Sequence, residues 1–191
     1  VLTSVDRDDL SDGGASQFAR TVRAIGELAS EIAIETLIPD FSGALEPLKE
    51  LVQSGPDLVS HNLETVERLT PVVRDPRCGY HLSLKVLRQV KELDANLPTK
   101  SSLLLGLGED EGEVIQAMQD LRAAGVDFLT LGQYLQPTRR HLPVFQYVPP
   151  HQFHRYRERA LDLGFRGVLS GPLVRSSYRA EEMFTHSEIN E

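Results

Sequence analysis

The chain has 191 residues, 40% of them hydrophobic and 25% charged, a composition typical of one globular domain in aqueous solution. Its formal net charge of -8 at pH 7 argues against non-specific binding to nucleic acid, because phosphates attract basic surfaces. Its apolar runs are too short to cross a bilayer, and the single cysteine, Cys78, excludes an internal disulfide and a multi-cysteine metal site within the chain.

The first half of the chain alternates short apolar runs with amphipathic helices. Strands are predicted over residues 1–5, 32–38 and 58–63. After the first strand, Phe18, Val22, Ile25 and Ala29 recur at the three- and four-residue spacing of one buried helix face. A longer helix is predicted from about Tyr80 to Leu93.

The second half continues the same alternation. Further strands are predicted over residues 103–107, 128–131 and 167–172, and a strand or an extended loop over 141–148. Asp110 and Glu113 have the spacing of a capping box, and Gly125 suits the end of the helix that they begin. Phe153, Tyr156 and Ala160 mark one face of a later helix.

This order of elements predicts an α/β fold with parallel strands, because each crossover covers the sheet with a helix. The sheet is either open and doubly wound or curved into a barrel. Polar clusters follow the strands, at residues 6–9, 62–65, 106–109 and 133–138. Such clusters favour a site at the carboxyl-terminal mouth of a complete or partial (β/α) barrel.

Two of these clusters have both a functional and a purely structural interpretation. Asn62 and Glu64 alternate on one face, where an amide and a carboxylate suit ribose hydroxyls or an amino group, but Glu64 could equally cap the next helix. The segment from Gly106 to Glu109 follows a strand as ligand-binding turns do. Because Glu111 stands where a dinucleotide fingerprint needs glycine, spacing alone favours a tight turn.

The remaining candidates are weaker on their residues alone. Residues 133–141 combine an aromatic ring, amides and two arginines, which suits a base and an anion or a solvated turn at Pro137. The segment 175–178 has no adjacent histidine or carboxylate to activate a serine, and reads as a polar tail. His151 and His154 are interpreted as helix-surface residues, and Cys78 as incidental.

Taken together, these segments resemble the lipoyl synthases in both order and spacing. The similarity covers essentially the whole chain and ends on Arg175-Ser176-Ser177-Tyr178. The matching segments are residues 3–10, 12–15, 61–65, 100–109, 133–144 and 171–178.

The resemblance implies a single, incomplete radical S-adenosylmethionine (SAM) domain over residues 1–191. It would be a partial (β/α)6 barrel without its first strand and cluster loops, and residues 141–191 would be a C-terminal extension. Lipoyl synthases carry two 4Fe–4S clusters and bind SAM. Their 5′-deoxyadenosyl radical removes hydrogens from C6 and C8 of an octanoyl-lysine, where two sulfurs are inserted.

The implied partners are octanoylated carrier domains, namely the E2 subunits of 2-oxoacid dehydrogenases and the glycine cleavage H protein, together with an electron donor. No nucleic acid or membrane partner is expected, and the expected location is the cytoplasm.

The resemblance also assigns roles to individual residues. Ser176, rather than Ser177, is similar to the serine that ligates the auxiliary cluster. The residues that would line the substrate channel are Asp6, Arg7, Arg139, Arg140 and His141. The residues that would hold SAM are Ser4, Asn62, Glu64, Lys100, Gly106, Gly108, Glu109, Leu135 and Gln136.

One departure from the family limits these expectations. The two three-cysteine motifs of the family would lie upstream of Val1, so the 191 residues as given should not assemble either cluster. Two alternatives therefore stay open. The first is a cluster-independent barrel aldolase or isomerase that uses Lys100 and Glu64. The second is a non-catalytic module that binds SAM or a carrier domain through Arg139, Arg140, Arg175 and Arg179.

Overall fold

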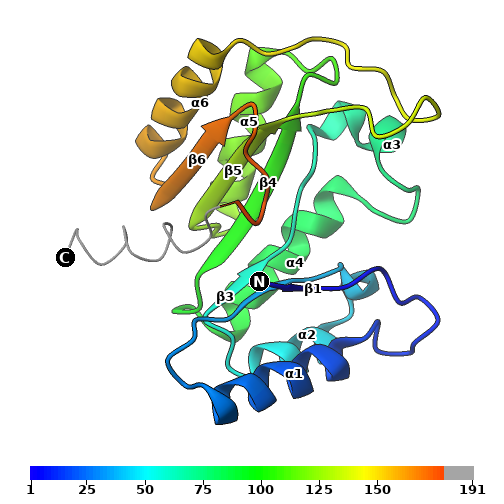
Figure 1. Cartoon of the computed structure of the whole chain (residues 1–191), viewed down its shortest axis with the longest axis vertical. Helices are drawn as coiled ribbons and strands as arrows, with labels where there is room; N and C mark the ends of the chain where they lie inside the picture. Colours follow the sequence, from blue (N-terminus) through cyan, green and yellow to red (C-terminus); the bar gives the residue numbers. More distant parts are fainter. Residues whose placement is uncertain (179–191) are drawn as a thin grey trace.

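The computed structural model describes residues 1–178 and forms one curved sheet with helices on its outer face (Figure 1). The strands are β1 (Leu2–Thr3), β2 (Glu35–Leu37), β3 (Leu58–Ser60), β4 (Thr99–Leu105), β5 (Phe128–Gln133) and β6 (Gly167–Gly171). The α-helices are α1 (Ala15–Leu28), α2 (Leu45–Val52), α3 (Thr70–Val73), α4 (Tyr80–Leu93), α5 (Glu111–Ala123) and α6 (Pro150–Asp162). Two 3-10 turns, η1 (Phe41–Gly43) and η2 (Glu67–Leu69), complete the fold.

The six strands are hydrogen-bonded in chain order, β1 to β6, and every pair is parallel. Because successive strands lie side by side and are joined by helices, the sheet has the topology of a barrel. The sheet does not close, and β1 and β6 are its two edges. The predicted α/β fold with a partial (β/α) barrel is therefore confirmed.

Strand alternation separates an apolar outer face from a polar inner face. Leu103, Leu105, Leu129 and Leu131 point outward into a core that they share with α4, α5 and α6. A second core packs α1, α2 and α4 against Val59. The side chains between these outward positions face the concave side, where the functional groups are found. No helix of residues 1–178 is long and apolar enough to cross a membrane.

Helix prediction was more accurate than strand prediction. The helix α4 has its predicted bounds, and the capping box of α5 is present, with Asp110 and Glu113 each accepting the other's backbone N–H. The strand β4 begins at Thr99 rather than at residue 103, because its polar residues are buried against neighbouring strands instead of lying in a loop. Residues 141–148 form an extended segment and not a strand.

Candidate functional site

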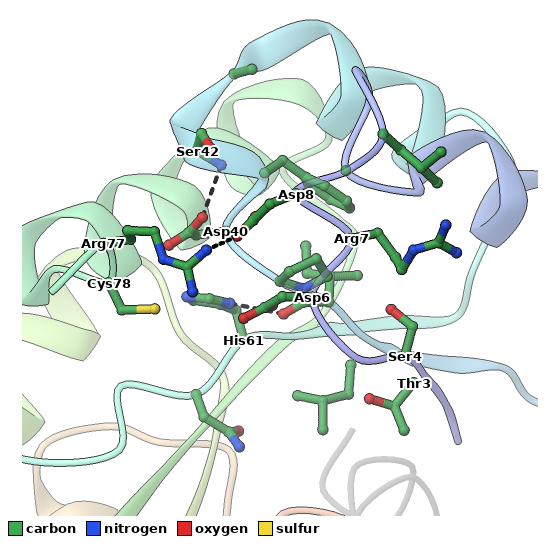
Figure 2. Close-up of a pocket in the computed structure, with 18 of the residues that line it drawn as sticks. Thr3, Ser4, Asp6, Arg7, Asp8, Asp40, Ser42, His61, Arg77 and Cys78 are labelled. Atoms are coloured by element: carbon green, nitrogen blue, oxygen red, sulfur yellow. Dashed lines mark hydrogen bonds and ion pairs between the residues drawn. The ribbon is translucent and has the colours of Figure 1, made fainter. Parts of the chain in front are cut away.

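A cavity of about 660 Å³ lies at the carboxyl ends of β1, β2 and β3 (Figure 2). This volume is in the range of small-molecule sites. Among its lining residues are five that the sequence singled out: Ser4, Asp6, Arg7, Asn62 and Glu64. The structure thus brings together candidates from the segments after β1 and β3. These strand ends meet because parallel strands present their carboxyl ends at one edge.

A local bulge at the end of β3 sets the positions of Asn62 and Glu64. Ser101 Oγ accepts the Leu63 N–H at 3.0 Å, so the next ladder bond, to the Ser102 carbonyl, comes from the Glu64 N–H at 2.9 Å. Glu64 adopts a φ of 69°, a left-handed conformation that is costly for a residue with a side chain. Bulges and strained residues of this kind redirect side chains at functional sites.

Asn62 and Glu64 form a hydrogen-bonded pair at the cavity wall. The Asn62 amide donates to Glu64 Oε1 at 3.0 Å, while Asn62 Oδ1 is buried and has no partner within residues 1–178. Burial raises the pKa of the Glu64 carboxyl, against the opposing effect of that hydrogen bond. The pair therefore offers a ligand one unused acceptor and one carboxylate that gains by meeting a donor or a cation.

His61 is a buried histidine with both ring nitrogens engaged. Nδ1 lies 2.9 Å from the Ile38 carbonyl, which can only accept, so Nδ1 carries the proton. Nε2 then accepts from the Ser83 hydroxyl at 2.9 Å, and the Ser83 oxygen accepts from Arg74 at 2.7 Å. Burial lowers the pKa of His61, which keeps the ring neutral and this chain of hydrogen bonds intact near pH 7.

Three arginines line the cavity, and two of them are bound to carboxylates. Arg7 pairs with Asp9 at 2.6 Å, and Figure 2 shows it extending away from His61 and Cys78. Arg77 pairs with Asp8 and with Asp75. The third, Arg74, forms no ion pair with any described carboxylate. Sequence reasoning missed Arg74, because it lies in a loop without periodicity.

Lys100 lies on the inner face of β4, below the cavity and outside its lining. Its amine pairs with Glu35 on β2 at 2.5 Å, and Ser60 on β3 donates to the same carboxylate at 2.6 Å. Lys100 is 1% exposed and Glu35 2%. Lys100 does not line the cavity and its amine is held by Glu35, so it is not placed to attack a ligand there, which removes the main support for an aldolase. Glu35 was also missed, although a lone carboxylate within an apolar strand was a usable signal.

The turn from Gly106 to Glu109 is closed by the side chain of Glu109. Glu109 accepts the N–H groups of Gly106 at 2.6 Å and Leu107 at 2.9 Å. Gly106 has a φ of 98°, and a Cβ there would lie 2.2 Å from the Gln146 carbonyl oxygen. The inner side of this turn is therefore filled by residues 133 and 146 and not by open space.

The loop 134–149 carries Leu135, Gln136, Arg139, Arg140 and His141, and all five are exposed. Gln136 donates to the His141 carbonyl at 2.7 Å, which fixes the local turn. The loop returns to the sheet, where the Phe145 N–H donates to the Gly106 carbonyl at 2.9 Å. These candidates lie together after β5, but none of them lines the cavity at β1–β3.

The segment after β6 turns back across the inner face of the sheet, in front of β4 in Figure 1. Val174 packs against Gly132 of β5. Ser176 is half-buried and Ser177 is exposed. The tail thus lies on the concave side, the side that also carries the cavity. Arg179, named for the binding-module alternative, lies outside the described residues.

The residues of this chain fit SAM better than they fit an iron–sulfur cluster. The cavity has a suitable volume and holds the unpaired Asn62 oxygen beside a carboxylate. One cysteine cannot supply the thiolates that hold a 4Fe–4S cluster. Residues 1–178 also contain no group of three histidine, cysteine or acidic side chains placed to hold a metal ion.

Comparison with known proteins gives a consistent family. No protein-family model matches the chain. It is 60% identical over 184 residues to the lipoyl synthase of Thermus thermophilus, covering 96% of the chain and 57% of the relative. It is 58% identical over 189 residues to the chloroplastic lipoyl synthase of Sorghum bicolor, covering 99% of the chain and 51% of the relative.

The mitochondrial lipoyl synthase of Drosophila mojavensis is 56% identical over 187 residues, covering 98% of the chain and 51% of the relative. Among solved structures, methylornithine synthase matches with a TM-score of 0.58 at 14% identity, covering 91% of this chain and 62% of that chain, which supports the fold alone. The chain is therefore similar over nearly its whole length to the lipoyl synthases, and it spans about half the length of the curated relatives that it matches.

Proposed function

We propose that this chain forms the SAM-binding barrel of a lipoyl synthase, which inserts two sulfur atoms at C6 and C8 of a protein-bound octanoyl-lysine. The observation that carries the proposal is the 60% identity to a lipoyl synthase over 96% of the chain. The partners would be the octanoylated E2 subunits of 2-oxoacid dehydrogenases and the glycine cleavage H protein, with an electron donor. The complete protein would act in the cytoplasm.

The cavity residues would bind and orient SAM, which on reduction supplies the group that abstracts hydrogen from the octanoyl chain. The Asn62 oxygen, which has no partner in residues 1–178, would accept from a ribose hydroxyl or an amino group. Glu64 beside it would accept a second hydrogen bond, and Ser4, at the end of β1, lines the same cavity. Lys100 would support this site from below through its contact with Glu35.

The second half of the sheet would hold the adenosyl part and the substrate. Gly106, Gly108 and Glu109 form one turn there, beside the exposed Leu135 and Gln136. We assign the substrate channel to both sides of the mouth, through Asp6, Arg7, Arg139, Arg140 and His141. Residues 1–191 would be one barrel domain, with residues from 141 onward as its extension.

The direct test uses the complete protein with reconstituted clusters. It should convert an octanoylated carrier peptide to the lipoylated form and release 5′-deoxyadenosine, both measurable by mass spectrometry. A Glu64→Ala variant should lose most of both products, because the paired side chains of the SAM site are broken. Failure of the wild-type protein to produce either compound would reject the proposal.

We assign Ser176 as the protein oxygen nearest the auxiliary cluster, with Ser177 as the less favoured neighbour. A hydroxyl is a weaker ligand for iron than a thiolate, which suits a cluster that must be dismantled. The combined variant Ser176→Ala and Ser177→Ala should lose lipoyl product while still binding SAM. Normal lipoyl formation by that variant would remove the assignment and leave the family function standing.

A further inference from the structure

Two aromatic side chains lie exposed on the loop 134–149, which joins β5 to α6 and is yellow in Figure 1. Phe145 is 75% exposed and Tyr147 is 71% exposed. Every other phenylalanine of residues 1–178 is buried. Single exposed apolar residues are ordinary on a protein surface, but two large rings so close in sequence are typical of a contact surface. We call Phe145 and Tyr147 the aromatic pair.

Hydrogen bonds hold the loop in one shape although most of it is exposed. The Tyr134 hydroxyl donates to the Leu142 carbonyl at 2.8 Å. The buried Gln133 side chain donates to the Gln146 carbonyl at 3.1 Å and accepts the Val148 N–H at 2.8 Å. The backbone on both sides of the aromatic pair is therefore fixed before a partner arrives, which lowers the entropic cost of binding.

The aromatic pair lies at the rim of the barrel mouth. The Phe145 N–H donates to the carbonyl of Gly106, the residue that follows β4, at 2.9 Å. The Phe145 ring covers Gly108, where a Cβ would lie 3.5 Å from the ring. The pair therefore rests on the turn after β4, at the carboxyl ends of the strands. A macromolecule that contacts the pair would lie across the rim.

The same loop carries two arginines whose charges are not matched by described carboxylates. The side chains of Arg139 and Arg140 are exposed and form no ion pair or hydrogen bond within residues 1–178. By contrast, Arg68 and Arg155 are paired with Glu113 and Glu111 of α5. The loop is therefore locally basic, although the chain has a net charge of -8. Exposed rings beside unpaired cations fit a protein partner with an acidic patch around an apolar centre.

We propose that the aromatic pair, with Arg139 and Arg140, is a docking surface for the folded carrier domain, which it contacts through an acidic patch beside the octanoyl-lysine. This inference rests on the proposed function, because an octanoyl chain attached to a protein can enter the mouth only if that protein meets the rim. The loop then recognises the folded surface of the carrier, and the acyl-lysine is held elsewhere. The complete protein should therefore bind a folded carrier more tightly than a short octanoyl-lysine peptide.

The test compares octanoylated glycine cleavage H protein with an octanoyl-lysine peptide that has the same flanking residues. Dissociation constants are measured for the complete wild-type protein and for the double variant Phe145→Ser, Tyr147→Ser. The matched control is Leu28→Ser, which removes a side chain that is 87% exposed at the end of α1, where the chain leads into β2. The wild type should bind the H protein about tenfold or more tighter than the peptide. The double variant should weaken H-protein binding by about 10- to 100-fold, the factor expected for removing aromatic anchors.

Peptide binding should stay the same in the double variant, and Leu28→Ser should change neither ligand. Combined Arg139→Gln and Arg140→Gln should reduce the salt dependence of H-protein binding, because two exposed charges are removed. Denaturant unfolding should be unchanged in the double variant, since both side chains are exposed. If it is less stable, each single serine variant makes the same comparison.

Three results would overturn the docking surface while leaving the proposed function intact. The double variant could bind the H protein as tightly as the wild type does, or it could weaken both ligands equally. The wild type could also bind the peptide as tightly as the H protein. A different result, in which the complete wild-type protein with reconstituted clusters forms no lipoyl product from either ligand, would reject the proposed function itself.

Discussion

The polar segments after β3 and β4 differ in how they use their hydrogen-bonding atoms. After β4, both carboxylate oxygens of Glu109 accept backbone N–H groups of their own turn. After β3, Asn62 keeps a buried oxygen without a partner within residues 1–178, and Glu64 holds a left-handed backbone conformation. The segment after β4 therefore pairs its carboxylate oxygens internally, whereas the segment after β3 leaves an acceptor unpaired within residues 1–178. Binding capacity follows from unused hydrogen-bonding atoms, and the residue type alone does not indicate it.

The largest loss of stability is expected at the buried ion pair between Lys100 and Glu35, which lies beneath the polar segments after β3 and β4. Lys100→Met should destabilise the complete protein by about 3–5 kcal/mol, because it leaves the Glu35 carboxylate buried without its cation. Denaturant unfolding measures the loss. Adding Glu35→Gln should recover much of it, since the uncompensated charge is then removed. A loss of stability under about 1 kcal/mol for Lys100→Met would mean that its ion pair with Glu35 does not support the segments after β3 and β4.

A matched pair of substitutions tests the comparison itself. Glu109→Gln should cost about 1–3 kcal/mol, because one backbone N–H of its turn then faces an amide NH2 instead of an acceptor. Glu64→Gln should leave stability unchanged or raise it near pH 7, because burial already disfavours its ionised form and raises its pKa. The same variant should weaken SAM binding. Equal stability losses at the two positions would contradict the difference between the strand ends.

The smallest effect on stability is expected at Asp12, whose half-buried carboxylate, like that of Glu109, accepts backbone N–H groups of its own turn. Hydrogen bonds from Ser16 and Gly14 lower the pKa of Asp12 to about 2. The stability that it contributes is fully present above its unfolded pKa of about 4, and is lost as the pH falls from there through the folded value. Asp12→Asn should remove this acid-dependent part of the unfolding free energy. An unchanged slope between pH 4 and pH 2 would show that these two hydrogen bonds to Asp12 do not form.

The order of strands and helices could be predicted because it depends on local periodicity. The capping box at Asp110 and Glu113 was also local, and it was predicted correctly. The contact between Lys100 and Glu35 joins strands that are not adjacent in the sheet, so no local pattern contains it. The bulge at the end of β3 and the contact of Arg74 with Ser83 likewise depend on tertiary neighbours. Resemblance to a family supplied residue roles that periodicity did not.

The contact between β5 and the segment after β6 restricts which residues can occupy position 132. A Cβ at Gly132 would lie 2.2 Å from the Val174 carbonyl oxygen, closer than atoms approach without displacement. The backbone of one segment therefore occupies the volume that the smallest chiral residue would need. Alanine at 132 and the present path of residues 172–178 exclude each other, so the tail can cross β5 at this point only because the strand has glycine there.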